Sequence, residues 1–238
     1  MQDPMLTRKI ATKSAMIRPR KRSGIELESA KPLHVKAYER IKHLIITLRL
    51  RPGEYVNETQ VSDILGLGRT PIHQALNRLT LEGMVEVIPR KGIIVRGISL
   101  NDVLEITDVR LINEIYCARL AAERANDSDI RDIRRIVDEA GKALPLADVE
   151  RQMMLDRDFH IALSQAAKNR VLTNLLTNLH DQSLRFWFIS LREREHHLAV
   201  HKEHVAILKA IEAHNADAAE RAIRTHIESF RKNVIRLL

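Results

Sequence analysis

Four side chains in the C-terminal half of the chain have the types and spacing that could bind a metal ion. Asp156 and His160 are four residues apart in a stretch of helical pattern, so they would share one face of a helix. His204 and His226 follow in two later stretches, each with apolar neighbours at helical spacing. One carboxylate and three imidazoles form a ligand set suited to Zn, Ni, Co or Mn, with coordination positions left open for water or a small ligand.

Other readings of these residues compete with a metal site. Eight of the eleven histidines lie between His160 and His226, and a helical histidine is more often a core or surface residue than a ligand. Five of them fall outside the proposed set, among them His180, His196, His197 and His201. Metal-assisted hydrolysis is a further alternative, since a metal with an open position can activate water. It is a remote one, because the sequence offers no separate general base.

The elements that must position these residues are helices, which fill the chain after residue 98. Helical periodicity divides this half into six segments, at residues 99–125, 127–144, 148–167, 169–191, 193–215 and 216–236. Asp127 and Asp148 stand where helix N-caps are expected. Short connections between helices of this length predict antiparallel neighbours in one bundle.

A different pattern occupies residues 33–98. Its elements follow as helix, short helix, tight turn, helix and two β-branched runs: Val35–Leu48, Asn57–Leu65, Gly66–Gly68, Arg69–Leu79, Val85–Ile88 and Ile93–Val95. This order is typical of a winged helix-turn-helix. It predicts that the N-terminal part of the chain binds double-stranded DNA.

The third of these helices would present polar side chains to the DNA. Its apolar stripe runs from Ile72 to Leu79, and the remaining positions are Arg69, Thr70, His73, Gln74, Asn77 and Arg78. Arginine suits guanine, and glutamine or asparagine suits adenine. We expect Arg90 and Lys91, at the tip of the hairpin, to contact the DNA backbone or the minor groove. A solvated polar helix face is the alternative.

The charge of the chain is divided in the same way. Residues 1–32 carry a net +5, residues 33–98 a net +4 and residues 99–238 a net −1. A basic N-terminal half attracts a polyanion, and residues 1–32 are expected to form a flexible basic arm. The sequence contains one cysteine, no long apolar run and no signal-peptide pattern, so we expect a cytoplasmic protein without a membrane partner.

The motifs of the N-terminal part resemble the DNA-binding domain of the GntR family of transcriptional regulators. The resemblance rests on Arg51-Pro-Gly-Glu54, Leu65-Gly-Leu-Gly-Arg-Thr-Pro71 and Glu82-Gly83 at the family's spacing. The chain departs from it at Gly68, where the family usually has serine, and at His73-Gln74, where it usually has Arg-Glu. These departures imply altered DNA contacts and therefore an altered operator.

The motifs of the C-terminal part resemble the FCD effector domain of the same family, in its shorter, six-helix type. They are Asp156-Arg-Asp-Phe-His160, Asn169-Arg-Val-Leu172, Glu203-His204 and Thr225-His226-Ile227. The resemblance implies that Asp156, His160, His204 and His226 bind a divalent transition metal, zinc foremost.

The resemblance also implies a small organic acid as effector, bound beside the metal. Arg110 and Arg185 are the candidates to bind its carboxylate, since a guanidinium can hold two oxygens at once. Arg110 could instead pair with Glu114, one turn later on the same helix.

These observations predict a mainly α protein, with a winged helix-turn-helix at residues 33–98 and an all-α antiparallel bundle at residues 99–238. We expect a ligand-responsive transcriptional repressor that binds a roughly palindromic operator as a homodimer. Effector binding in the bundle would change the affinity of the protein for DNA. Two alternatives remain open: the metal itself is the signal, or the effector is lipid-like and needs no metal.

Overall fold

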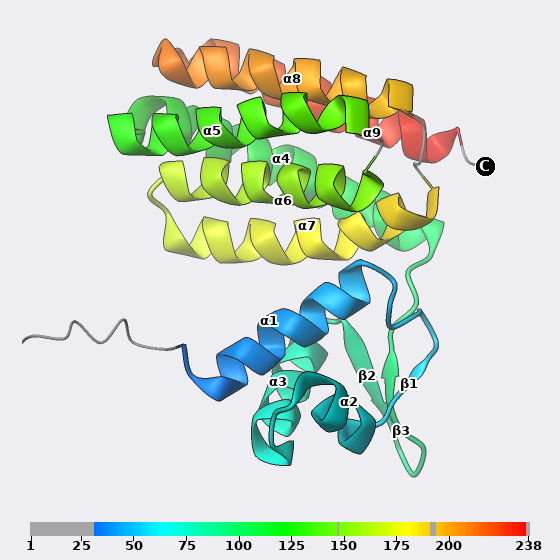
Figure 1. Cartoon of the computed structure of the whole chain (residues 1–238). Helices are drawn as coiled ribbons and strands as arrows, with labels where there is room; N and C mark the ends of the chain where they lie inside the picture. The colour runs from blue at the N-terminus through cyan, green and yellow to red at the C-terminus, as the bar shows by residue number, and fades with distance from the viewer. Residues whose placement is uncertain (1–30, 147, 191–193, 237–238) are drawn as a thin grey trace, which may run out of the picture. The chain divides into compact units, whose positions relative to one another are not determined.

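The computed structural model describes residues 31–146, 148–190 and 194–236, so the predicted basic arm lies almost wholly outside the described residues. The N-terminal elements are α1 (Leu33–Ile46), β1 (Tyr55–Val56), α2 (Glu58–Leu65), α3 (Arg69–Leu81), β2 (Val85–Ile88) and β3 (Gly92–Val95). They form the predicted winged helix-turn-helix (Figure 1).

The turn between α2 and α3 follows from local sequence. The Asn57 side chain accepts hydrogen bonds from the backbone amides of Thr59 and Gln60, and so caps the start of α2. Gly66 ends that helix at a φ of 62°. This left-handed conformation favours glycine. The helices pack through fully buried apolar residues, among them Ile41, Ile72, Leu76 and Leu79.

The wing contains one strand more than the sequence predicted. The strands are antiparallel in the order β1-β3-β2, with Val85 opposite Val95 and Tyr55 opposite Ile94. Strand β1 consists of two residues, Tyr55 and Val56. A strand of that length has no periodicity to detect, and its pairing depends on a distant segment of the chain.

The C-terminal elements form a helical bundle. They are α4 (Leu100–Arg124), α5 (Asp127–Ala143), the short 3₁₀ helix η1 (Leu144–Leu146), α6 (Val149–Ala166), α7 (Arg170–Ser190), α8 (Arg194–Glu212) and α9 (Ala216–Ile235). The six α-helices correspond to the six predicted segments. Asp148 caps α6 as expected, whereas Asn126 caps α5 in place of Asp127 and forms a capping box with Asp129.

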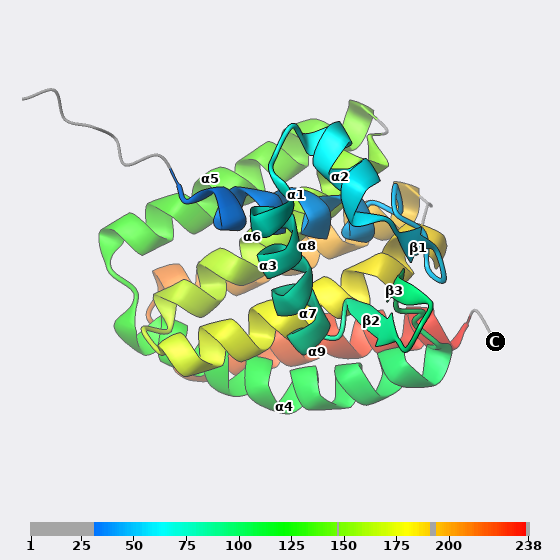
Figure 2. The same ribbon diagram turned by 90° about the horizontal axis from the view of Figure 1, so that it is seen from below.

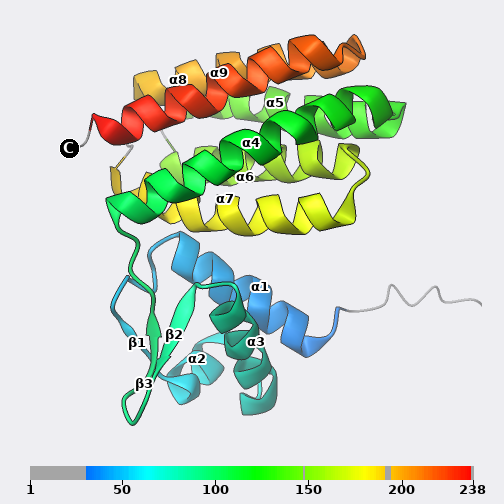
Figure 3. The same cartoon turned by 180° about the vertical axis from the view of Figure 1, so that it is seen from behind.

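The bundle helices run along a common direction when the structure is seen from below (Figure 2). Helices α4 and α9 lie side by side, and α7 is the bundle helix that faces α1 (Figures 1 and 3). Among the described residues, no helix has the length and apolar character needed to cross a membrane.

Candidate functional site

The polar face of α3 is open to solvent. Ile72, Ala75, Leu76 and Leu79 are buried, as the periodicity predicted. All six residues proposed for DNA contact on this helix are exposed: Arg69, Thr70, His73, Gln74, Asn77 and Arg78. Arg90 and Lys91 are exposed at the connection between β2 and β3.

Two of these side chains also have partners within the protein. Nδ1 of His73 lies 3.0 Å from Glu58, and Arg78 donates to Glu82 at 3.0 Å. The Arg78 guanidinium also stacks over the Tyr38 ring at 3.6 Å, a cation–π contact. Contact of Arg78 with DNA would therefore compete with contacts that hold α3 against α1.

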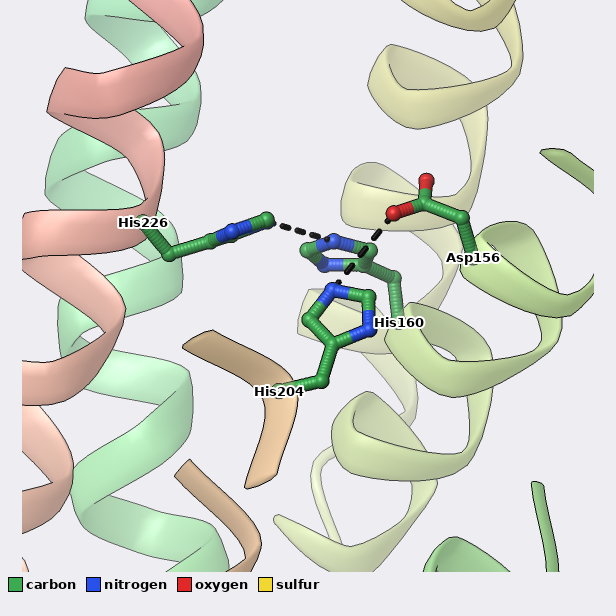
Figure 4. Close-up of side chains that lie close together, drawn as sticks. All are labelled: Asp156, His160, His204 and His226. Atoms are coloured by element: carbon green, nitrogen blue, oxygen red, sulfur yellow. Dashed lines mark hydrogen bonds and ion pairs between the residues drawn. The ribbon is translucent and has the colours of Figure 1, made fainter. Parts of the chain in front are cut away.

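The predicted metal ligands meet in the interior of the bundle. Helix α6 supplies Asp156 and His160, α8 supplies His204, and α9 supplies His226; all four side chains point toward a common centre (Figure 4). One ligand atom from each lies within 4.8 Å of the others, and all four residues are buried. This closeness is what a single bound ion requires.

Carboxylates behind two of the histidines control which ring nitrogen faces that centre. Nδ1 of His226 lies 2.8 Å from Glu203, and Nδ1 of His160 lies 2.9 Å from Glu114. An ionised carboxylate only accepts hydrogen bonds, so both carboxylates favour the tautomer in which Nδ1 carries the proton and Nε2 presents its lone pair. The two Nε2 atoms are 3.1 Å apart, a separation that needs a cation or a proton between them.

Other atoms at the centre also lack partners. Among the described residues, Oδ1 of Asp156, Nε2 of His204 and both ring nitrogens of His180 are buried and form no hydrogen bond, although Nε2 of His204 and Nε2 of His180 lie 3.4 and 3.2 Å from the Asp156 carboxylate. Unpaired buried polar atoms are unfavourable unless a ligand satisfies them. The residues present therefore fit a divalent metal ion.

The protonation states agree with metal binding at neutral pH. Burial by itself would raise the pKa of Asp156, but contact with His180 and the charges of the nearby histidines hold it well below its usual range. Burial lowers the pKa of His180 to about 4, and it lowers the pKa of His204 as well. A carboxylate and neutral imidazoles are the forms that bind metals.

The space at this centre is small. A cavity of about 10 Å³ is lined by Arg110, His160, His180, Ser183 and Trp187, among others. That volume holds about one water molecule. An organic acid would therefore need the surrounding helices to move apart.

The structure separates the two arginines proposed for the effector. Arg110 lines the cavity, donates to Ser183 at 3.1 Å and pairs with Glu114 at 2.6 Å, so the salt-bridge alternative is also present. Arg185 does not line this cavity. It is fully buried elsewhere on α7 and donates to the carbonyl of Arg96, at the end of the wing.

Sequence reasoning missed three residues of the site. His180 belongs to the set treated as outside the metal site, and yet it lies 3.2 Å from Asp156. Glu114 was considered only as a partner for Arg110, and Glu203 only as part of a motif. No spacing in the sequence marks Glu203 as the partner of His226, because the two residues lie on different helices.

Comparisons with known proteins agree with this architecture. Residues 33–95 match the model for bacterial regulatory proteins of the gntR family, and residues 105–229 match the model for the FCD domain. The Nta operon transcriptional regulator of Aminobacter aminovorans is 26% identical over 195 residues, which cover 82% of this chain and 91% of that protein.

Two Escherichia coli proteins extend the comparison. The HTH-type transcriptional repressor RspR is 23% identical over 209 residues, which cover 88% of this chain and 92% of the relative. The solved structure of McbR/YncC has the same fold, with a TM-score of 0.78 at 18% identity, covering 87% of this chain and 99% of that one. The relatives are regulators of transcription, which removes support from the metallohydrolase alternative.

Proposed function

The chain belongs to the GntR family of bacterial transcriptional regulators and contains its FCD domain, and from that premise we propose that it is a repressor controlled by a metal-dependent effector site in its bundle. The buried cluster of Asp156, His160, His204 and His226 is the observation that carries the proposal. A bound metal would supply the positive charge that holds an anionic effector.

The effector class follows from the groups around the cluster. Arg110 is buried, lines the cavity and has donors suited to a carboxylate. The hydroxyl of Ser183 lies beside Arg110 and accepts a hydrogen bond from its guanidinium. A lipid-like effector has less support, because polar side chains line this small space. We therefore propose a small carboxylate bound between Arg110 and the metal, and a metal sensed by itself is the alternative.

DNA binding by α3 and the wing is the second part of the proposal. The six exposed residues of α3 would read the major groove, and Arg90 and Lys91 would contact the backbone or the minor groove. A plot of the logarithm of the DNA-binding constant against the logarithm of the salt concentration has a negative slope. Each lost phosphate contact should reduce the size of that slope by about 0.9. Selection from a random duplex library with the full chain would define the operator.

A homodimer is the third part. The outer face of α4 exposes Val109, Ile112 and Tyr116, at the spacing i, i+3 and i+7, and Ile112 is 73% exposed. A second copy packed on this stripe would bury it and give the two-fold symmetry that a palindromic operator requires. Light scattering should find a dimer for the full chain and a monomer for Ile112→Glu. A dimer for this variant would place the interface elsewhere.

Metal content tests the proposed site. Elemental mass spectrometry of the purified full chain should find about one zinc per chain, the stoichiometry of one four-ligand site. His204→Ala should lose it. The matched control is His201→Ala, on the same helix but outside the cluster, which should keep its metal. Protein that neither contains zinc nor takes it up on reconstitution would overturn the metal site.

A further inference from the structure

Two neighbouring pairs of residues join α6 to α7. Asp156 of α6 lies 3.2 Å from Nε2 of His180 on α7, beside the metal-ligand cluster. The next residue on each helix forms the second pair, in which Arg157 donates to Asp181 at 3.2 Å. Successive helical residues are about 100° apart around the axis, so the two pairs point in different directions. The Asp156–His180 pair faces the cluster, and the Arg157–Asp181 pair faces α1.

The second pair also binds the DNA-binding domain. Nζ of Lys42, on α1, lies 2.7 Å from Asp181 and 2.7 Å from Glu82. Lys42 is 5% exposed and Asp181 is fully buried, so this contact is shielded from solvent. Burial by itself would raise the pKa of Asp181, but Arg157 and Lys42 lower it, and the carboxylate stays charged at neutral pH.

Glu82 connects this contact to the recognition helix. It is the C-cap of α3, and its backbone carbonyl accepts from the side chains of Asn178 and Gln182 on α7, at 3.2 and 3.3 Å. Its carboxylate accepts from Arg78 and from Tyr38. Helix α7 therefore binds both α1 and the end of α3.

The same helix forms a wall of the effector cavity. His180, Ser183, Leu184 and Trp187 of α7 line the space of about 10 Å³. A ligand larger than a water molecule has to displace part of this lining. A shift of α7 at His180 also moves Asp181, since the two residues are consecutive in a rigid helix.

We propose that Asp181 couples the bundle site to the DNA-binding domain, through its ion pairs with Arg157 and Lys42. This coupling rests on the proposed function of the cluster. The Asp181 ion pairs are the contact through which occupancy of the cluster would affect the DNA-binding domain. Filling the site fixes Asp156 and His180, which repositions Arg157 and Asp181 and, through Lys42 and Glu82, the orientation of α1 and α3. Lys42 is a positioning residue in this scheme, because it touches neither metal nor effector.

Zinc is the probe for the test, and hydrogen exchange is the readout. The full chain is compared after metal removal and after zinc addition, and exchange is followed in peptides from α1 and α3. Fluorescence of Trp187, the one tryptophan of the sequence, reports zinc binding in the same samples, since its side chain lines the cavity. We expect zinc to change the exchange rates of α1 and α3 by about fivefold or more in the wild type.

The test variant is Lys42→Met, which removes the charge and keeps most of the apolar stem. Asp181 retains Arg157, and Glu82 retains Arg78 and Tyr38, so no carboxylate is left without a donor. We expect Lys42→Met to bind zinc with unchanged fluorescence response but to lose the zinc-dependent change in α1 and α3. Lys42→Arg should keep that change, and Lys42→Gln replaces the methionine variant if that protein does not fold.

The matched control is Glu150→Gln, which removes another contact between the N-terminal part and α6. Glu150 is half-buried, lies 3.4 Å from both Arg49 and His43, and is not one of the clustered residues. This variant should respond to zinc as the wild type does. A full zinc response in Lys42→Met would overturn the coupling role of this contact, and so would bound zinc without any response in the wild type. Failure to bind zinc at all would instead disprove the proposed function on which the coupling rests.

Discussion

The behaviour of the cluster depends on which nitrogen of each histidine carries a proton. Glu114 and Glu203 lie against Nδ1 of His160 and His226, and they direct both Nε2 lone pairs toward the centre. Such carboxylates raise the basicity of a ligand and fix its orientation. They belong to the proposed metal site although neither is a proposed ligand.

Removing one of these carboxylates should weaken metal binding without removing a ligand. We expect Glu203→Ala to lower zinc affinity by about 10- to 100-fold, because the His226 ring loses its orientation and its preferred tautomer. Competition with a chromophoric chelator measures the affinity. Glu212→Ala is the control on the same helix, where the carboxylate pairs with Arg134 at the surface. Equal zinc affinity in Glu203→Ala and the wild type would disprove the role of Glu203.

At the residue scale the sequence predicted the closeness of the four candidate ligands better than it predicted their surroundings. Asp156 and His160 share a helix face, so their closeness follows from the helical repeat. His180 and Glu114 come from α7 and α4, and their distance to the cluster depends on how those helices pack. Spacing along the chain contains no information on that packing. Arg185 illustrates the same limit. The sequence around it did not indicate that its side chain donates a hydrogen bond to the carbonyl of Arg96, at the end of the wing, and does not line the cavity.

Among the elements, α3 begins without a side-chain cap. Gly68 occupies the N-cap in an extended conformation, with φ −63° and ψ 162°, and makes no side-chain hydrogen bond. An added Cβ would meet its nearest atom, Cδ of Pro71, at an ordinary 3.8 Å. Serine fits this position without strain.

Gly68→Ser should therefore stabilise the protein. A serine hydroxyl would accept a free amide of the first turn, and replacing glycine reduces the entropy of the unfolded chain. We expect the free energy of unfolding to rise by about 0.5–1 kcal/mol, measured by urea denaturation. Gly66→Ser is the contrasting variant, because its φ of 62° makes any side chain strained. A Gly68→Ser protein no more stable than the wild type would show that the cap does not form.

Element prediction succeeded wherever a repeat was long. The six bundle helices and the apolar face of α3 follow from the 3.6-residue period. The cap of α5 was misplaced by one residue because Asn126 and Asp127 are both good capping residues. The hydrogen bond that the Asn126 amide donates to the Asp129 carboxylate decides between them. Strand β1 was missed because two residues contain no period.

For the whole molecule, the ion pairs around Asp181 make stability depend on pH. Its pKa is lowered in the folded protein, so the folded carboxyl binds a proton less readily than the unfolded one. The contribution of Asp181 to the free energy of unfolding is therefore fully present above the pKa of the carboxyl in the unfolded chain, about 3.9. It is lost as the pH falls below that value.

Asp181→Asn should show this dependence directly. At pH 7 the variant leaves Lys42 and Arg157 without this carboxylate, and we expect a loss of about 3–5 kcal/mol in the free energy of unfolding. The difference from the wild type should shrink as the pH falls below about 4, because the unfolded wild-type chain then binds a proton at Asp181 that the folded carboxyl, with its lowered pKa, does not. Denaturation followed by circular dichroism measures both proteins. A difference that does not change with pH would contradict the assignment.

The central claim is that occupancy of the bundle site changes the affinity of the protein for DNA, and the affinity itself tests it most directly. Fluorescence anisotropy with a duplex selected by the full chain gives the Kd after metal removal and with zinc bound. We predict a change of about fivefold or more in the wild type, and a change within about twofold in His204→Ala. Equal affinities for the wild type with and without bound zinc, and with a panel of short carboxylates added, would contradict the account.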